Sequence, residues 1–122
     1  MPRRLLPLVG AVLVLSAFSG AAYFHAQLVR AMPGVDGTMK APPAALQLWF
    51  NQPVNPRLTS ATLLTADSTP LSKVQFIATP DSLNVVGPVG VWLQPGEYRV
   101  QWRSMSDDGH VIRGEYRFRL AR

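Results

Sequence analysis

The chain contains no cysteine, and this absence limits both its stability and its chemistry. Without thiolates, cysteine-type zinc sites and iron–sulfur clusters are excluded. No disulfide can support the fold either, so an apolar core has to stabilise it. Enzymes that use a thiol nucleophile are excluded for the same reason.

Other catalytic and binding signals are also missing. The sequence has no Gly-x-Ser-x-Gly elbow and no glycine-rich phosphate loop, so serine hydrolases and nucleotide-binding enzymes gain no support. Lys and Arg outnumber Asp and Glu by 12 to 7, but the basic residues are scattered along the chain instead of forming an arm or stripe. We expect no nucleic-acid partner, because tracking phosphates needs a concentrated basic surface.

The amino-terminal segment has the zones of a secretory signal. Arg3 and Arg4 precede an apolar run from Leu5 to Phe18, which small residues follow. The run is shorter than the roughly 20 residues that span a bilayer, although the apolar residues continue far enough to allow an uncleaved anchor. We predict a signal peptide or uncleaved anchor at 1–24, a single folded domain at 25–122, and membrane contact only if the segment is uncleaved.

The rest of the chain is divided into short segments by its 11 prolines and 9 glycines. Apolar and polar residues alternate in Ala45–Phe50, Glu97–Arg103 and Glu115–Leu120, as in strands with one buried face. Weaker strand candidates are 27–31, 61–66, 74–78, 82–86 and 91–93. The pattern predicts a single antiparallel Greek-key β-sandwich of seven to eight strands, with no helix longer than a turn.

Two further structural expectations follow from the same pattern. Tyr98, Trp102, Tyr116 and Phe118 fall on inward strand faces, which favours core packing over a cofactor site. The polar segment Thr65–Lys73 predicts a mobile surface loop.

The sequence has only two histidines, His25 and His110, at opposite ends of the folded domain. Asp108 and His110 flank a glycine, so in a strand-like backbone their side chains point to the same side and can converge on one ion. In a sandwich the first strand can lie beside the last ones, which would bring His25 close. Two imidazoles and one carboxylate make the mixed nitrogen and oxygen ligand set typical of Cu(II). The alternative is that Asp-Gly is an ordinary turn and His110 a solvated turn residue.

Several stretches of the chain resemble the bacterial copper-resistance CopC family. They are His25–Val29, Pro33–Gly37, Ala41–Phe50 and Leu93–Leu120, and together they cover nearly all of the chain after residue 24. Family members begin the mature chain with a histidine and carry a Trp-Arg-x-x-Ser-x-Asp-Gly-His segment near the end. This chain has that segment from Trp102 to His110.

The resemblance implies a cupredoxin-like or immunoglobulin-like sandwich in the periplasm that binds copper for sequestration or delivery in copper homeostasis and resistance. It implies one Cu(II) per chain on His25, Asp108 and His110, no enzymatic activity, a monomer, and by analogy an inner-membrane copper importer as recipient. Some members use a methionine-rich loop for Cu(I). The methionines of this chain are scattered, so we predict no dedicated Cu(I) site.

Besides the scattered methionines, the chain departs from the family pattern in two other places. The family uses the terminal amine of its first histidine as a ligand, but Phe24 is a poor residue for signal peptidase to cut behind. Cleavage after Ala22 would make Tyr23 the first residue, followed by Phe24 and His25. The terminal amine, two backbone amides and the His25 imidazole can then chelate Cu(II), in competition with the family site. Gln52 stands where the family often has a carboxylate.

Two other functions remain open at this point. An exported interaction module without metal would use Asp108 and His110 only as turn residues. A histidine-brace copper oxygenase would also use two histidines, but it needs an open coordination position that Asp108 would occupy.

Overall fold

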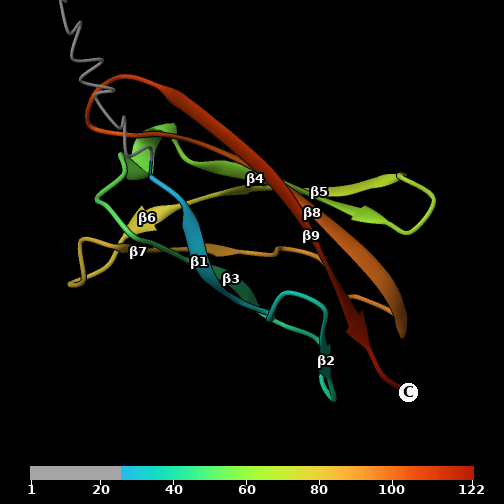
Figure 1. The fold of residues 1–122 in the computed structure, drawn as a ribbon. Coiled ribbons are helices and arrows are strands. Elements are labelled where there is room, and N and C mark those ends of the chain that lie inside the picture. Colours follow the sequence, from blue (N-terminus) through green and yellow to red (C-terminus); the bar gives the residue numbers. More distant parts are fainter. Residues whose placement is uncertain (1–25) are drawn as a thin grey trace, which may run out of the picture.

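A computed structural model describes residues 26–122 as two β-sheets packed face to face (Figure 1). The predicted signal segment 1–24 and His25 lie outside the described residues. The four-stranded sheet has the order β1 (Leu28–Met32), β3 (Ala45–Phe50), β7 (Asn84–Pro88) and β6 (Ile77–Ala78). The five-stranded sheet has the order β2 (Gly37–Met39), β9 (Val111–Leu120), β8 (Gly96–Met105), β4 (Ser60–Thr65) and β5 (Pro70–Gln75). The predicted all-β sandwich is confirmed.

The three strongly alternating segments all form strands, and they lie within β3, β8 and β9. The strand count was predicted slightly low, because the short strands β2 and β6 carry too few residues for a visible pattern. Strand β2 pairs with β9 in parallel, whereas the other strand pairs are antiparallel among residues 26–122. The single helical element there is a 3₁₀ turn, η1 (Pro56–Leu58), so no helix in this range is long enough to cross a bilayer.

Two local predictions were wrong. Pro70–Lys73 belongs to β5 and not to a mobile loop, because the turn after β4 closes within 66–69. Val91–Leu93 is not a strand; it follows Gly90, whose φ of 74° turns the chain away from an extended path. Leu93 is nonetheless buried and holds this connection against the core.

The core lies between the sheets, where alternate residues of each strand meet. The four aromatic residues predicted to face inward are all buried: Tyr98, Trp102, Tyr116 and Phe118. Trp102 meets Phe50 of the other sheet edge to face, with ring centres 5.5 Å apart. Gly114 lies against the Trp102 ring, since a Cβ at this glycine would come within 2.5 Å of the indole. These contacts hold the β8–β9 hairpin against the core at the paired residues Trp102 and Gly114.

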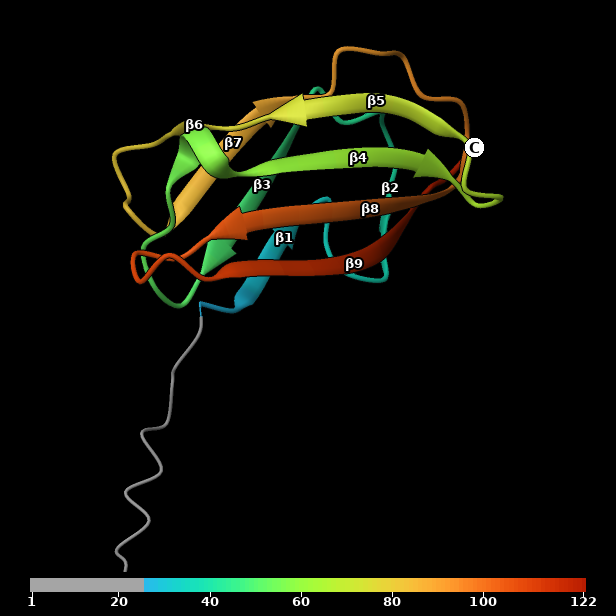
Figure 2. The same cartoon turned by 90° about the horizontal axis from the view of Figure 1, so that it is seen from above.

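This hairpin positions the predicted metal loop. Strands β8 and β9 pair from Gly96↔Leu120 to Met105↔Val111, and residues 106–110 connect them at one end of the sandwich (Figure 2). The chain before η1 supports the base of this connection, because Val54 forms a β-bridge with Ser106 and the Asn55 N–H donates to the Met105 carbonyl at 3.2 Å.

Candidate metal centre

The loop that carries Asp108 and His110 is closed by its own backbone. The Ser106 N–H donates to the His110 carbonyl at 3.0 Å, and the Gly109 N–H donates to the Ser106 carbonyl at 2.9 Å. Gly109 has a φ of 84°, in the left-handed region that favours glycine. The predicted Asp-Gly turn is therefore present, and it projects Asp108 and His110 from one short segment.

Hydrogen bonds hold the Asp108 carboxylate in place. Its Oδ1 accepts from the Ser106 hydroxyl and from the His110 N–H, the latter at 3.1 Å. These bonds, led by the one from Ser106, hold the pKa of Asp108 well below its usual range. The side chain is thus a carboxylate at any pH near neutrality, and it presents a negative charge to the loop.

The second carboxylate oxygen meets the histidine ring. Asp108 Oδ2 lies 2.8 Å from His110 Nδ1. A carboxylate can only accept a hydrogen bond, so Nδ1 carries the proton in this arrangement. Two donor atoms that each lie about 2.0 Å from a divalent metal at a right angle are about 2.8 Å apart. The same spacing is that of an ordinary N–H···O hydrogen bond, so an ion bound by both atoms would replace the proton that now lies between them.

Both side chains are accessible from solvent. The side chain of His110 is 55% exposed and that of Asp108 is 45% exposed. An ion held here could be loaded and released without unfolding the loop. No three His, Asp or Glu side chains within 26–122 are grouped closely enough to hold a metal, so this pair needs a further donor.

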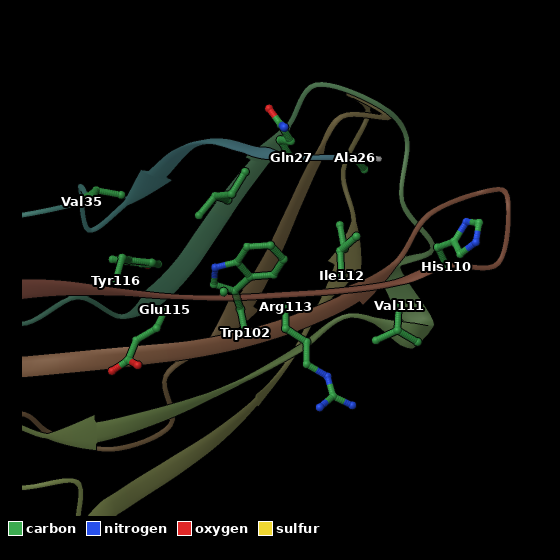
Figure 3. A pocket seen from close by; sticks show the side chains of 12 residues that line it. Ala26, Gln27, Val35, Trp102, His110, Val111, Ile112, Arg113, Glu115 and Tyr116 are labelled. Atoms are coloured by element: carbon green, nitrogen blue, oxygen red, sulfur yellow. The ribbon is translucent and has the colours of Figure 1, made fainter. Parts of the chain in front are cut away.

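The start of the described chain lies against the same region. Ala26 and Gln27 line a cavity of about 640 Å³ whose wall also includes His110 and Trp102. Figure 3 shows Ala26 and Gln27 across this cavity from β9, with the His110 ring at one end. Ala26 directly follows His25 in the sequence, and it is the first residue that the structure describes. The described chain therefore begins on the cavity that His110 also lines.

Hydrogen bonds to Asn51, the residue directly after β3, fix the direction of this first segment. The Gln27 N–H donates to Asn51 Oδ1 at 2.7 Å, and the Asn51 N–H donates to the Gln27 carbonyl at 3.0 Å. Ala26 is buried as part of the core. The placement of Ala26 beside the loop is thus set by contacts with the folded domain.

Sequence reasoning missed the part played by Ser106. The signal was present, because this serine is the one in the Trp-Arg-x-x-Ser-x-Asp-Gly-His segment, but its role needs the turn geometry. It also missed Asn51, whose side-chain amide oxygen accepts a hydrogen bond from the Gln27 N–H. Asn51 directly precedes Gln52, the position where the family often has a carboxylate.

Two of the methionines, Met39 and Met105, lie far apart in the structure. Met39 pairs with Leu120 and Met105 with Val111, so they lie at opposite ends of the ten-residue strand β9. At about 3.3 Å per residue, that strand keeps their thioethers too far apart to bind one ion.

Comparisons of the chain with sequence profiles, related proteins and solved structures agree on one family. The sequence profile described as the CopC domain matches residues 28–121. The chain is 31% identical over 109 residues to copper resistance protein C of Xanthomonas campestris pv. juglandis, covering 84% of this chain and 85% of that protein. It is 27% identical over 109 residues to protein YobA of Escherichia coli K12, covering 88% of each.

Solved structures are similar too. The crystal structure of CopC from Methylosinus trichosporium OB3b superposes with a TM-score of 0.73 at 26% identity, covering 80% of this chain and 94% of that one. PcoC, described as a methionine-rich copper resistance protein from Escherichia coli, superposes with a TM-score of 0.67 at 28% identity. The match covers 79% of this chain and 98% of PcoC.

Proposed function

This chain belongs to the CopC family of copper-binding, copper-resistance proteins, and we propose that it binds one Cu(II) ion on His25, Asp108 and His110. The proposal gives two imidazole nitrogens and one carboxylate oxygen, a set that suits Cu(II). The remaining position goes to the terminal amine if His25 is the first residue of the mature protein, and otherwise to water.

The observation that carries this proposal is the pairing of Asp108 with His110. Their donor atoms lie 2.8 Å apart on a loop that the backbone has already closed. A metal that replaces the proton on Nδ1 meets a carboxylate that is already ionised, because the pKa of Asp108 is lowered. The position of Ala26 on the shared cavity supports His25 as the third protein ligand.

The exposure of the site favours a carrier or a reservoir over an enzyme. Asp108 would fill a position in the copper plane that an oxygenase keeps open for its substrate or oxygen. We propose that the protein works as a monomer in the periplasm, and that it sequesters copper or passes it to an inner-membrane importer. The half-exposed loop suits such an exchange.

The mature amino terminus decides which further donor is present. Mass spectrometry of the exported protein gives it directly. If Tyr23 is the first residue, its amine lies two residues before His25 and forms a competing chelate.

Calorimetric titration with Cu(II) tests the proposal. Wild type should bind one ion per chain, and His25→Ala and His110→Ala should each lower the affinity. Electron paramagnetic resonance of the loaded protein should show a tetragonal Cu(II) signal whose nitrogen couplings decrease in both variants. Unchanged stoichiometry and affinity in His110→Ala would show that the loop does not bind the ion.

A further inference from the structure

The outward face of the five-stranded sheet gathers most of the basic residues. Alternation along β5, β8 and β9 turns one set of side chains to solvent while the other enters the core. The outward basic residues are Lys73, Arg99, Arg103, Arg113, Arg117 and Arg119, which we call the basic face. Figure 2 views this sheet in front of the other one. The residues that look scattered in sequence therefore form one surface.

The charge of the domain is unevenly distributed as a result. The basic face holds 6 of the 10 Lys and Arg residues within 26–122, and only Glu97 and Glu115 of the 7 acidic ones share it. Its formal charge is +4, whereas all other side chains in that range sum to −1. The face thus carries the net positive charge of the described chain.

The basic face is not neutralised by the protein itself. Arg99 lies directly opposite Arg117, and Arg103 lies opposite Arg113, on paired strands. Like charges in such cross-strand pairs are destabilising. Only Arg99 forms an ion pair on this face in the described part of the chain, with Glu115. The repulsion between these paired arginines is therefore not relieved within the protein, and external anions bound to this face would reduce it.

One part of the face is hollowed. Arg57 of η1, Lys73 of β5 and Arg103 of β8 line a depression of about 230 Å³, together with Ser60 and Gln75. None of the three cations has a carboxylate within ion-pair distance among residues 26–122. Guanidinium and ammonium groups with neighbouring hydroxyl and amide donors are the groups that bind phosphate. The side chain of Leu58, which is 47% exposed, also lines this depression.

We propose that the basic face docks the protein on a bilayer that contains anionic phospholipid, with a lipid phosphate in the depression between Arg57, Lys73 and Arg103. A specific protein interface has aromatic and apolar anchors at its centre. The aromatic residues of β8 and β9 are all buried, and the outward positions are charged or polar over most of the face. A dispersed cationic surface whose exposed apolar side chains, Leu58, Leu71 and Val111, lie on separate elements matches lipid headgroups instead.

The orientation leaves the metal loop accessible. Residues 106–110 lie at the end of the β8–β9 hairpin, and the basic face runs along that hairpin (Figure 2). A domain lying on a membrane through this face would keep Asp108 and His110 at its edge. Membrane docking is independent of copper binding, so either one can fail without the other.

Cosedimentation with vesicles tests the docking. The exported protein is mixed with vesicles of phosphatidylcholine alone or of equal parts phosphatidylcholine and phosphatidylglycerol. Binding should require the anionic lipid and weaken as salt is added. Lys73→Glu with Arg103→Glu should reduce binding at least about 25-fold, since each cation near an anionic surface contributes about fivefold.

The matched control reverses one charge on the other sheet. Arg30→Glu gives the same net charge as Arg103→Glu alone and should bind close to wild type, because Arg30 lies on the four-stranded sheet beside Trp49, whereas Arg103→Glu should lose at least about fivefold. Equal losses in these two single variants would overturn the proposal, as would equal binding to both vesicle types. Polyglutamate binding without vesicle binding would instead indicate an acidic protein partner. Saturable binding of inorganic phosphate without vesicle binding would indicate a soluble ligand, and either result would overturn membrane docking.

Discussion

Two turns at opposite ends of the five-stranded sheet share one hydrogen-bonding design but differ in the side chain two positions after the aspartate. The Asp67 turn, residues 65–69, joins β4 to β5, and the Asp108 turn, residues 106–110, joins β8 to β9. In each, the aspartate accepts from a hydroxyl two residues before it and from the N–H two residues after it. The next residue has a positive φ in both, 70° at Ser68 and 84° at Gly109.

The electrostatic result is also shared. The pKa of Asp67 is lowered mainly by the Thr65 hydroxyl, as the pKa of Asp108 is lowered mainly by the Ser106 hydroxyl. An ionised, hydrogen-bonded aspartate is therefore a way of closing a turn in this fold and does not by itself indicate a metal. The difference is the residue two positions on, which is Thr69 in one turn and His110 in the other.

Location separates the two turns as well. Thr65 pairs with Tyr98 near the start of β8, whereas the Asp108 turn follows Met105 at its end. Only the Asp108 turn shares a cavity with Ala26 among residues 26–122. The comparison teaches that the proposed copper site depends on the imidazole and the nearby amino-terminal segment, and not on the aspartate turn alone.

The largest effect should come from exchanging the distinguishing residue. His110→Thr gives the Asp108 turn the side chain of the Asp67 turn, so the loop should close while Cu(II) affinity falls by more than about a hundredfold, beyond typical second-shell losses. Thr69→His is the reciprocal control and should not create a copper site, because the Asp67 turn lies at the other end of the sheet. Calorimetry measures both, and a gain of copper binding in Thr69→His would contradict the role given to location.

Removing the charge should have the next largest effect. Asp108→Asn keeps an acceptor for the turn but removes the negative ligand, so Cu(II) affinity should fall by about 10- to 100-fold. Asp67→Asn makes the same change in the other turn and should leave copper binding unaltered. If Asp108→Asn retains the affinity and the loaded spectrum, Asp108 orients the His110 ring and is not a ligand.

Acidification should weaken copper binding through the imidazoles and not through Asp108. An imidazole has to be neutral to bind a metal, so protons compete with copper for it. In the pH range where imidazoles protonate, the Cu(II) affinity should fall by about tenfold per pH unit for each histidine ligand. Because the pKa of Asp108 is lowered, its carboxylate stays ionised throughout that range. Titrations between neutral and mildly acid pH should therefore give a steeper dependence in wild type than in His25→Ala; equal slopes would remove His25 from the site.

Much of the fold was predictable because strand alternation is a local property. Tyr98, Val100 and Trp102 alternate with Arg99, Gln101 and Arg103, and the structure buries the first set as predicted. Short strands such as β2 were not predictable, because three residues cannot show a period and its pairing depends on β9.

The Asp-Gly turn at Asp108 was predictable from the sequence, but its construction was not, and its role as a metal site stays a prediction. Asp108 and His110 stood out as a carboxylate and an imidazole two positions apart, whereas the role of Ser106 depends on how the loop folds back. The basic face shows the same limit. The arginines are scattered along the sequence, but the prediction that they form no concentrated surface was wrong. The pairing of β8 with β9 brings Arg103 beside Arg113.

The smallest effect separates the two turns by the strength of their hydroxyl bonds. Ser106→Ala and Thr65→Ala each remove the largest cause of a lowered pKa, so the pKa of Asp108 and of Asp67 should rise toward the usual value. An aspartate whose pKa is lowered on folding stabilises the protein above its unfolded-state pKa and loses this effect as the pH falls. Each alanine variant should therefore lose some stability at neutral pH and little in strong acid. Carboxyl NMR titration measures both pKa values, and we expect the larger rise at Asp108. A larger rise at Asp67 would show that the Thr65 hydroxyl, and not the Ser106 hydroxyl, lowers the pKa of its aspartate more.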